Sequence, residues 1–113
     1  MVILGGPIAI DELKRIAADT FGDMVKAVVD MRRGLLSLDA ELHSDLEALL
    51  LDDGSRQSDL WGINFYPFLE RDDFVEFDSM INMRPSQGNM SRGVDDEAVR
   101  KKIIEIVDKW VTM

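Results

Sequence analysis

Segments of helical periodicity alternate along this chain with segments of strand periodicity, and this alternation limits the fold more than any other feature. Apolar residues recur at helical spacing in three segments, which begin at Leu13, Leu46 and Val99. Branched and aromatic residues form strand-like runs at 24–31, 35–42, 60–66 and 74–83. The order predicts an α+β fold, with a four-stranded, mainly antiparallel sheet and about three helices packed on one face.

Local stop signals separate these segments. Gly22 follows the first helical segment, and residues 32–34 (Arg-Arg-Gly) form the turn between the first two strand runs. Ser44 and Glu47 have the spacing of a capping box, which predicts that the second helix begins at Ser44. The last helix is expected from near Asp95, and residues 2–4 could add one short strand.

The length of 113 residues suits one ordinary hydrophobic core, so we expect a single domain over 1–113. No run approaches the ~20 apolar residues of a membrane-spanning helix, and the first residues lack the basic region of a signal peptide. Cysteine is absent, which leaves no disulfide or thiolate metal site. A soluble, cytoplasmic protein is therefore expected.

The charge balance bears on the class of partner. The chain has 22 acidic and 13 basic side chains, for a net charge of −9. Nucleic-acid binding is disfavoured, because it draws most of its affinity from Lys and Arg contacts to phosphates. The stretch 39–53 is acidic and contains no Lys or Arg. A basic protein, masked in the manner of an antitoxin, or a divalent cation fits this charge better.

Period-two alternation divides each predicted strand into an apolar and a polar face. If the helices cover the apolar face, the other face carries Lys26, Asp30, Glu41, His43, Asn64, Tyr66, Asp78, Asn82 and Arg84. A solvated face is the ordinary interpretation of such a pattern. Asn and Asp are depleted in strands, however, and this favours a ligand site or a polar subunit interface as the alternative.

The leading hypothesis for function is a non-enzymatic binding module. It would use the polar sheet face and the loops 55–59 and 84–89 to bind a small polar ligand or a protein partner, as a homodimer. The candidate ligand-binding residues are His43, Arg56, Gln57, Asn64, Tyr66, Asp78, Asn82 and Arg84. The chain matches no nucleotide-binding motif, and no organic cofactor is evident.

The alternative hypothesis is a divalent-metal-dependent hydrolase or transferase that uses Glu41, His43 and Asp78. Glu41 and His43 are two residues apart, so they would project from the same face of a strand and could bind one cation. His43 is the only histidine, whereas catalytic zinc usually has two or three. Mg²⁺ or Mn²⁺, held mainly by carboxylates such as Asp39, is a further option.

Four segments together resemble a family of short prokaryotic proteins of unknown function. They read GDMVKAVVD from Gly22, ELHSDLE from Glu41, GSRQSDLWGINFYP from Gly54 and DSMINMRP from Asp78. The similarity extends from about Pro7 to the last helix. It implies a stand-alone single domain, and it implies no particular activity because the family is of unknown function. Asp39-Ala40 stands where the resemblance implies two glycines.

Overall fold

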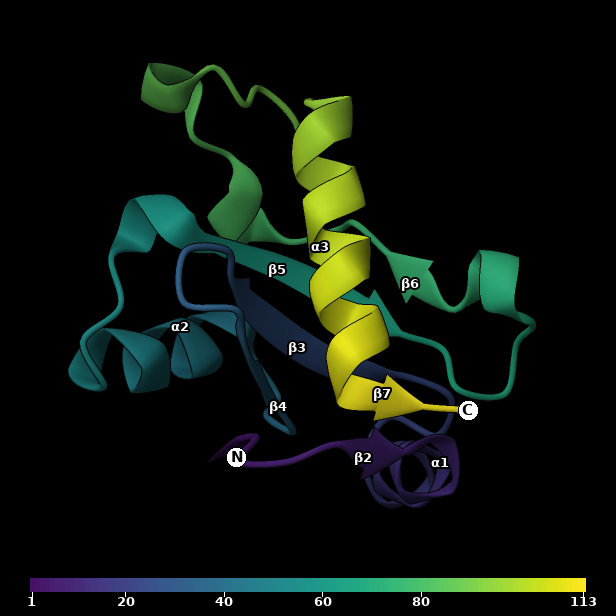
Figure 1. The fold of residues 1–113 in the computed structure, drawn as a ribbon. Helices are drawn as coiled ribbons and strands as arrows, with labels where there is room; N and C mark the ends of the chain where they lie inside the picture. The colour runs from purple at the N-terminus through teal and green to yellow at the C-terminus, as the bar shows by residue number, and fades with distance from the viewer.

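The computed structural model describes all 113 residues, with a five-stranded antiparallel sheet at the centre (Figure 1). In spatial order the strands are β1 (Val2–Ile3), β4 (Leu35–Leu38), β3 (Val25–Asp30), β5 (Leu60–Phe65) and β6 (Val75–Glu76). The helices are α1 (Ile10–Asp19), α2 (His43–Asp52) and α3 (Glu97–Trp110). Two further short strands, β2 (Ile8–Ala9) and β7 (Val111–Thr112), pair in parallel. The α+β class is confirmed, and the fifth strand arises because residues 2–3 pair with β4.

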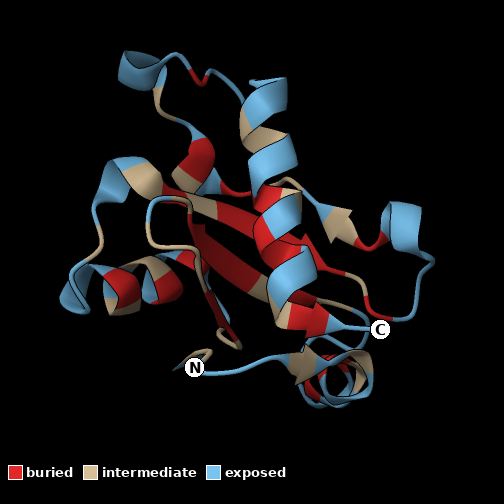
Figure 2. Ribbon diagram, viewed as in Figure 1, coloured by how far each residue is buried: buried red, intermediate tan, exposed pale blue.

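The larger part of the core lies between one face of the sheet and helices α1 and α3 (Figure 2). Val25, Ala27 and Val29 of β3 point to this face and are buried, as period-two alternation predicts. Ile103 and Val107 of α3 lie one helical turn apart and belong to the same apolar cluster. None of the three helices is long and apolar enough to span a membrane.

Helix α2 covers the opposite face of the sheet. Its Leu46 and Leu50 are fully buried against Val28 of β3 and Leu60 of β5. The prediction that all helices pack on one face is therefore wrong for α2. Val28 and Leu60 give that face apolar area beside its polar residues, and shielding this area from water favours a covering helix.

The strand predicted at 74–83 is interrupted. Only Val75–Glu76 pairs with β5, and a 3₁₀ turn follows at Met80–Asn82. This turn lies close to Gly62 of β5, where an added Cβ would come within 2.5 Å of the Cβ of Ser79. Because Gly62 has no side chain, the 3₁₀ turn can pack directly against β5. The predicted strand would instead have continued alongside β5 to residue 83.

Two aspartates mark the ends of the β3–β4 hairpin. The buried carboxylate of Asp30 accepts hydrogen bonds from the backbone N–H groups of Arg32 and Arg33 and from the hydroxyl of Ser55. It closes the turn between the two strands. Asp39, directly after β4, has φ of 73°, in the left-handed region that favours glycine. That conformation agrees with the glycine that the resemblance implies here.

Candidate functional site

The structure separates the eight predicted ligand-binding residues along β5. Arg56, Gln57 and Arg84 lie near the first residue of the strand, where Arg84 contacts the backbone. His43, Asn64, Tyr66 and Asp78 lie toward its last residues, and Asn82 lies between the two groups. The predicted residues therefore do not form one site.

Arg84 supports the backbone at the start of β5. Its guanidinium lies 4.2 Å from the centroid of the Trp61 ring and donates hydrogen bonds to the backbone carbonyls of Gln57 and Leu60. The side chains of Arg56 and Gln57 are exposed and form no hydrogen bond within the chain. The contacts of Arg84 are those of a structural residue, because its two terminal nitrogens donate to the protein's own carbonyls, although Nε is buried without a partner.

Asn82 supports the next part of the same strand edge. Its Oδ1 accepts the N–H of Gly62 at 2.8 Å, and its Nδ2 donates to the carbonyl of Gly62 at 2.9 Å. Nδ2 also donates to the carbonyl of Arg92 at 2.9 Å. The side-chain amide takes the place of a partner strand, and the side chain is fully buried.

The second group begins with three residues that lie side by side on the sheet face covered by α2. Lys26 of β3 is paired in register with Asn64 of β5, which is paired with Glu76 of β6. Asn64 Nδ2 donates to Glu76 Oε1 at 2.9 Å and to the carbonyl of Asp78 at 3.2 Å. The Tyr66 hydroxyl donates to the same Glu76 oxygen at 3.1 Å. Asn64 Oδ1 is buried without a hydrogen-bond partner.

His43 is the first residue of α2 and reaches down to β5. Only 7% of the residue is exposed, and its Nε2 lies 2.8 Å from the carbonyl oxygen of Ile63. A carbonyl can only accept, so Nε2 carries the proton and Nδ1 of the neutral ring is an acceptor. Burial lowers the pKa of His43 and the charge of Lys26 adds to this, while the Ile63 carbonyl, the Asn64 amide and the charge of Asp78 oppose it. The ring is therefore neutral at pH 7.

A pocket of about 160 Å³, the α2 pocket, opens beside this ring. It is lined by Lys26, Leu42, His43, Ser44, Ser79, Met80, Ile81 and Arg92. The predicted capping box at Ser44 does not form, because α2 begins one residue earlier and Leu42 provides no side-chain cap. Backbone N–H groups of the first turn are thus left without a side-chain acceptor beside the pocket.

Of the two basic side chains that line the α2 pocket, Arg92 has a carboxylate partner and Lys26 has none. Arg92 is paired with Asp78, with Nε and Oδ1 2.7 Å apart. Lys26 forms no salt bridge, and its nearest aromatic partner is Phe21, whose ring centroid lies 5.6 Å from Nζ. One unpaired cation and the positive end of α2 therefore face the same small space.

The proposed metal ligands are not brought together. Glu41 is exposed and lines a different hollow, of about 420 Å³, together with Phe21 and Leu42. No group of three histidine or carboxylate side chains is close enough to hold a cation. The structure thus provides no cluster for the predicted set of Glu41, His43 and Asp78.

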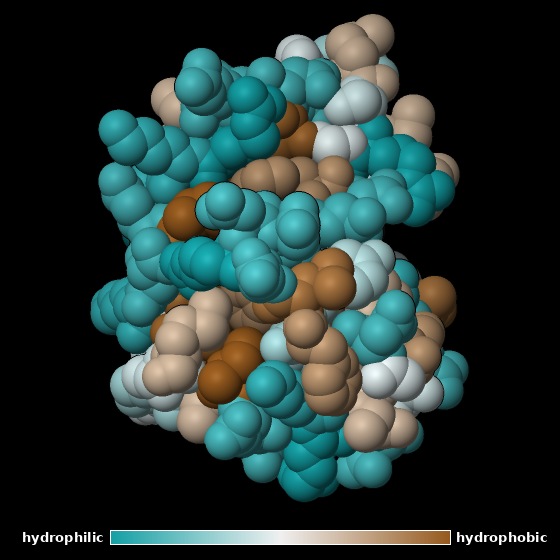
Figure 3. Space-filling view, turned by 90° about the vertical axis from the view of Figure 1, so that its right-hand side faces the viewer, coloured by the Kyte–Doolittle hydropathy of each residue, from teal (hydrophilic) through white to brown (hydrophobic).

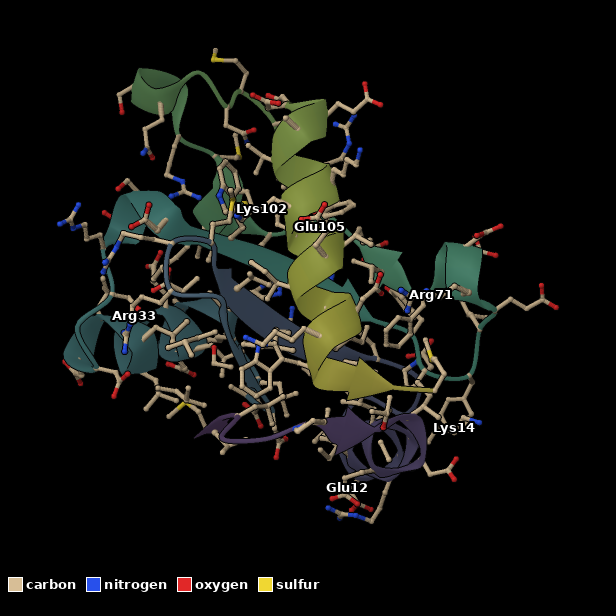
Figure 4. The ribbon with its side chains drawn as sticks, viewed as in Figure 1. Glu12, Lys14, Arg33, Arg71, Lys102 and Glu105 are labelled. Carbon is tan, nitrogen blue, oxygen red and sulfur yellow. The ribbon has the colours of Figure 1, made fainter.

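The other hollows lack a buried polar group that is free to bind: one of about 330 Å³ is lined by the buried Asn89, but its amide already bonds to four backbone groups. Between the β3–β4 turn and α3, Lys102 and Glu105 border one of about 280 Å³, but the nearby Arg33 is directed to Asp53 at the end of α2 (Figure 4). On the side that carries β6, apolar side chains are visible between polar ones (Figure 3). A hollow of about 260 Å³ there is lined by Val75 and Phe77, among others. The α2 pocket is the one that contains a buried imidazole.

Sequence reasoning placed His43 in the candidate site but omitted Lys26, Ser44, Ser79 and Arg92. The alternation in the sequence does place Lys26 on the same polar face as Asn64. The structure pairs these two residues in register on neighbouring strands. Arg92 comes from an irregular segment that no periodicity places, and Ser79 lies in the predicted fourth strand, which the structure replaces here by the start of a 3₁₀ turn.

Comparisons with known proteins agree with the resemblance noted in the sequence. No curated protein and no solved structure is significantly similar to the chain. A family model described as "Protein of unknown function (DUF5674)" matches residues 2–110, which is nearly the whole chain. The match confirms the expected uncharacterised family. This chain is therefore a member of the DUF5674 family.

Proposed function

We propose that this chain is a non-enzymatic binding protein, and that it holds a small, negatively charged ligand in the α2 pocket. The single observation that carries the proposal is Lys26, a half-buried cation without a carboxylate partner at the wall of a small pocket. A cation in such a position is stabilised when an anion binds next to it. The leading hypothesis from the sequence is thereby narrowed to one site and one sign of charge.

The start of α2 supports the same sign of charge. The first turn of a helix carries a partial positive charge, and its free N–H groups are donors for an anion. The hydroxyls of Ser44 and Ser79 line the same pocket. Ser79 accepts a hydrogen bond from the N–H of Ile81, so its own hydroxyl proton is free for a ligand. Charge, N–H groups and hydroxyls all favour an anionic group.

The test is thermal unfolding with acetate, propionate, phosphate and sulfate, each added at constant ionic strength against chloride. A ligand at 100 times its Kd should stabilise the native state by about 2.7 kcal/mol, which corresponds to several degrees in Tm. Lys26→Met should abolish the shift. The matched control is Lys14→Met, because Lys14 on α1 also lies over a phenylalanine ring but lines no pocket (Figure 4). Equal shifts in the two variants would refute the proposal.

A further inference from the structure

The proposed function leaves open what the ligand carries besides its negative charge. We propose that it is a small α-hydroxy carboxylate, whose carboxylate lies at Lys26 and the start of α2 and whose hydroxyl donates to Nδ1 of His43. This inference rests on the proposed function and specifies its ligand class.

The state of His43 requires a donor from the ligand. Its Nε2–H is used by the Ile63 carbonyl, which fixes the tautomer and leaves the Nδ1 lone pair as an acceptor. Nδ1 makes no hydrogen bond within the chain, and it is not among the buried atoms that solvent cannot reach. His43 lines the α2 pocket although only 7% of the residue is exposed. A ligand that fills the pocket without donating there would leave this acceptor unpaired, which is unfavourable.

The size of the pocket places the donor close to the charge. The pocket has a volume of about 160 Å³, and His43 and Ser44 are consecutive residues in the first turn of α2. A carboxylate held by N–H groups of that turn is therefore within a few bonds of any group that reaches the imidazole. A donor on the carbon next to the carboxylate fits this spacing.

The charges around the pocket favour a hydroxyl over an ammonium group as the donor. Lys26 is unpaired and the start of α2 is positive, so a ligand ammonium would be repelled by both. The nearby carboxylates are already engaged: Asp78 pairs with Arg92, and Glu76 accepts from Asn64 and Tyr66. A neutral hydroxyl can donate to His43 without that repulsion.

Isothermal titration with three matched probes tests the inference. Lactate carries the carboxylate and the hydroxyl, propionate lacks the hydroxyl, and alanine carries an ammonium in its place. Lactate, tried as each enantiomer, should bind about ten-fold more tightly than propionate, since one hydrogen bond to a buried acceptor has roughly that effect on affinity. Alanine should bind more weakly than propionate.

His43→Gln provides the matched variant. The glutamine amide can still donate to the Ile63 carbonyl, but it offers no acceptor at the position of Nδ1. In this variant the ratio of the lactate affinity to the propionate affinity should fall from about ten to about one.

The outcomes separate the two proposals. Equal binding of lactate and propionate to the unmodified protein would overturn the hydroxy-acid inference and leave the anion site standing. Tighter binding of alanine than of lactate would overturn it as well. No binding of any carboxylate, together with no thermal shift, would overturn the proposed function and this inference with it. The comparison of probes on the unmodified protein needs no variant to fold.

Discussion

Replacing Asn82 by alanine tests whether a side chain, and not a strand, completes the edge of β5. Asn82 is fully buried and forms three hydrogen bonds to backbone groups, two with Gly62 and one with Arg92. Alanine removes all three and leaves the buried N–H and carbonyl of Gly62 without these partners, whereas the carbonyl of Arg92 still accepts the N–H of Ser79.

The size of the effect follows mainly from the two bonds to Gly62, because these leave buried groups unpaired. A lost hydrogen bond that leaves a buried group unpaired costs about 1–3 kcal/mol, and partial relaxation toward water favours the lower end. We therefore expect Asn82→Ala to lower the free energy of unfolding by about 2–4 kcal/mol, out of the roughly 5–15 kcal/mol that is typical of a domain. The corresponding fall in Tm is on the order of 10–20 °C.

Urea unfolding followed by tryptophan fluorescence measures this free energy, with Gln87→Ala as the control. Gln87 lies in the neighbouring 3₁₀ turn, is exposed, and should change the stability by less than about 0.5 kcal/mol. Hydrogen exchange gives an independent readout, because the Gly62 amide should be protected in the unmodified protein and exchange faster in Asn82→Ala. A loss below about 1 kcal/mol with unchanged Gly62 exchange would refute the argument.

Three further predictions concern neighbouring contacts. Gly62→Ala should destabilise the fold by about 1–3 kcal/mol because its Cβ would meet Ser79, and adding Ser79→Gly should recover part of the loss in urea unfolding. The pKa of His43 lies below its ordinary value of 6.5, so the unfolded state binds more protons than the folded state. The free energy of unfolding should therefore fall as the pH drops below 6.5, by at most about 1.4 kcal/mol per pH unit. His43→Gln should lack this component of the pH profile. Arg84→Lys should cost about 1–3 kcal/mol in thermal unfolding, because an ammonium cannot span two carbonyls while stacked on Trp61, and equal stability would contradict this role.

Much of the fold follows from periodicity in the sequence. The alternation in β3 and β5 assigns Val25, Ala27 and Ile63 to the face that α1 and α3 cover. The placement of α2 was missed because the polar residues of the other face received more weight than Val28 and Leu60. Two apolar positions among polar ones are sufficient to favour a covering helix when they are diagonal neighbours on the same face of paired strands, as Val28 and Leu60 are.

The end of the predicted fourth strand could not be anticipated from local pattern. Residues 77–83 alternate as a strand would, but tertiary contacts decide their conformation. Gly62 provides the space and Asn82 provides the hydrogen bonds, and both effects come from residues about 20 positions apart. The same long-range contacts assign Asn82 and Arg84 to structural roles, although their residue types equally suit ligand binding.

Lys26 should behave in the opposite way to these structural residues. It is half-buried and lies near the positive start of α2, and no carboxylate stabilises its charge in the ligand-free protein. Lys26→Met should therefore raise the free energy of unfolding by about 0.5–1 kcal/mol while it abolishes anion binding, the trade-off expected of a functional residue. Lys14→Met should give no gain, since Lys14 lies 4.0 Å from Asp11. Urea unfolding without ligand measures both variants, and a less stable Lys26→Met protein would show that the lysine supports the fold instead of a site.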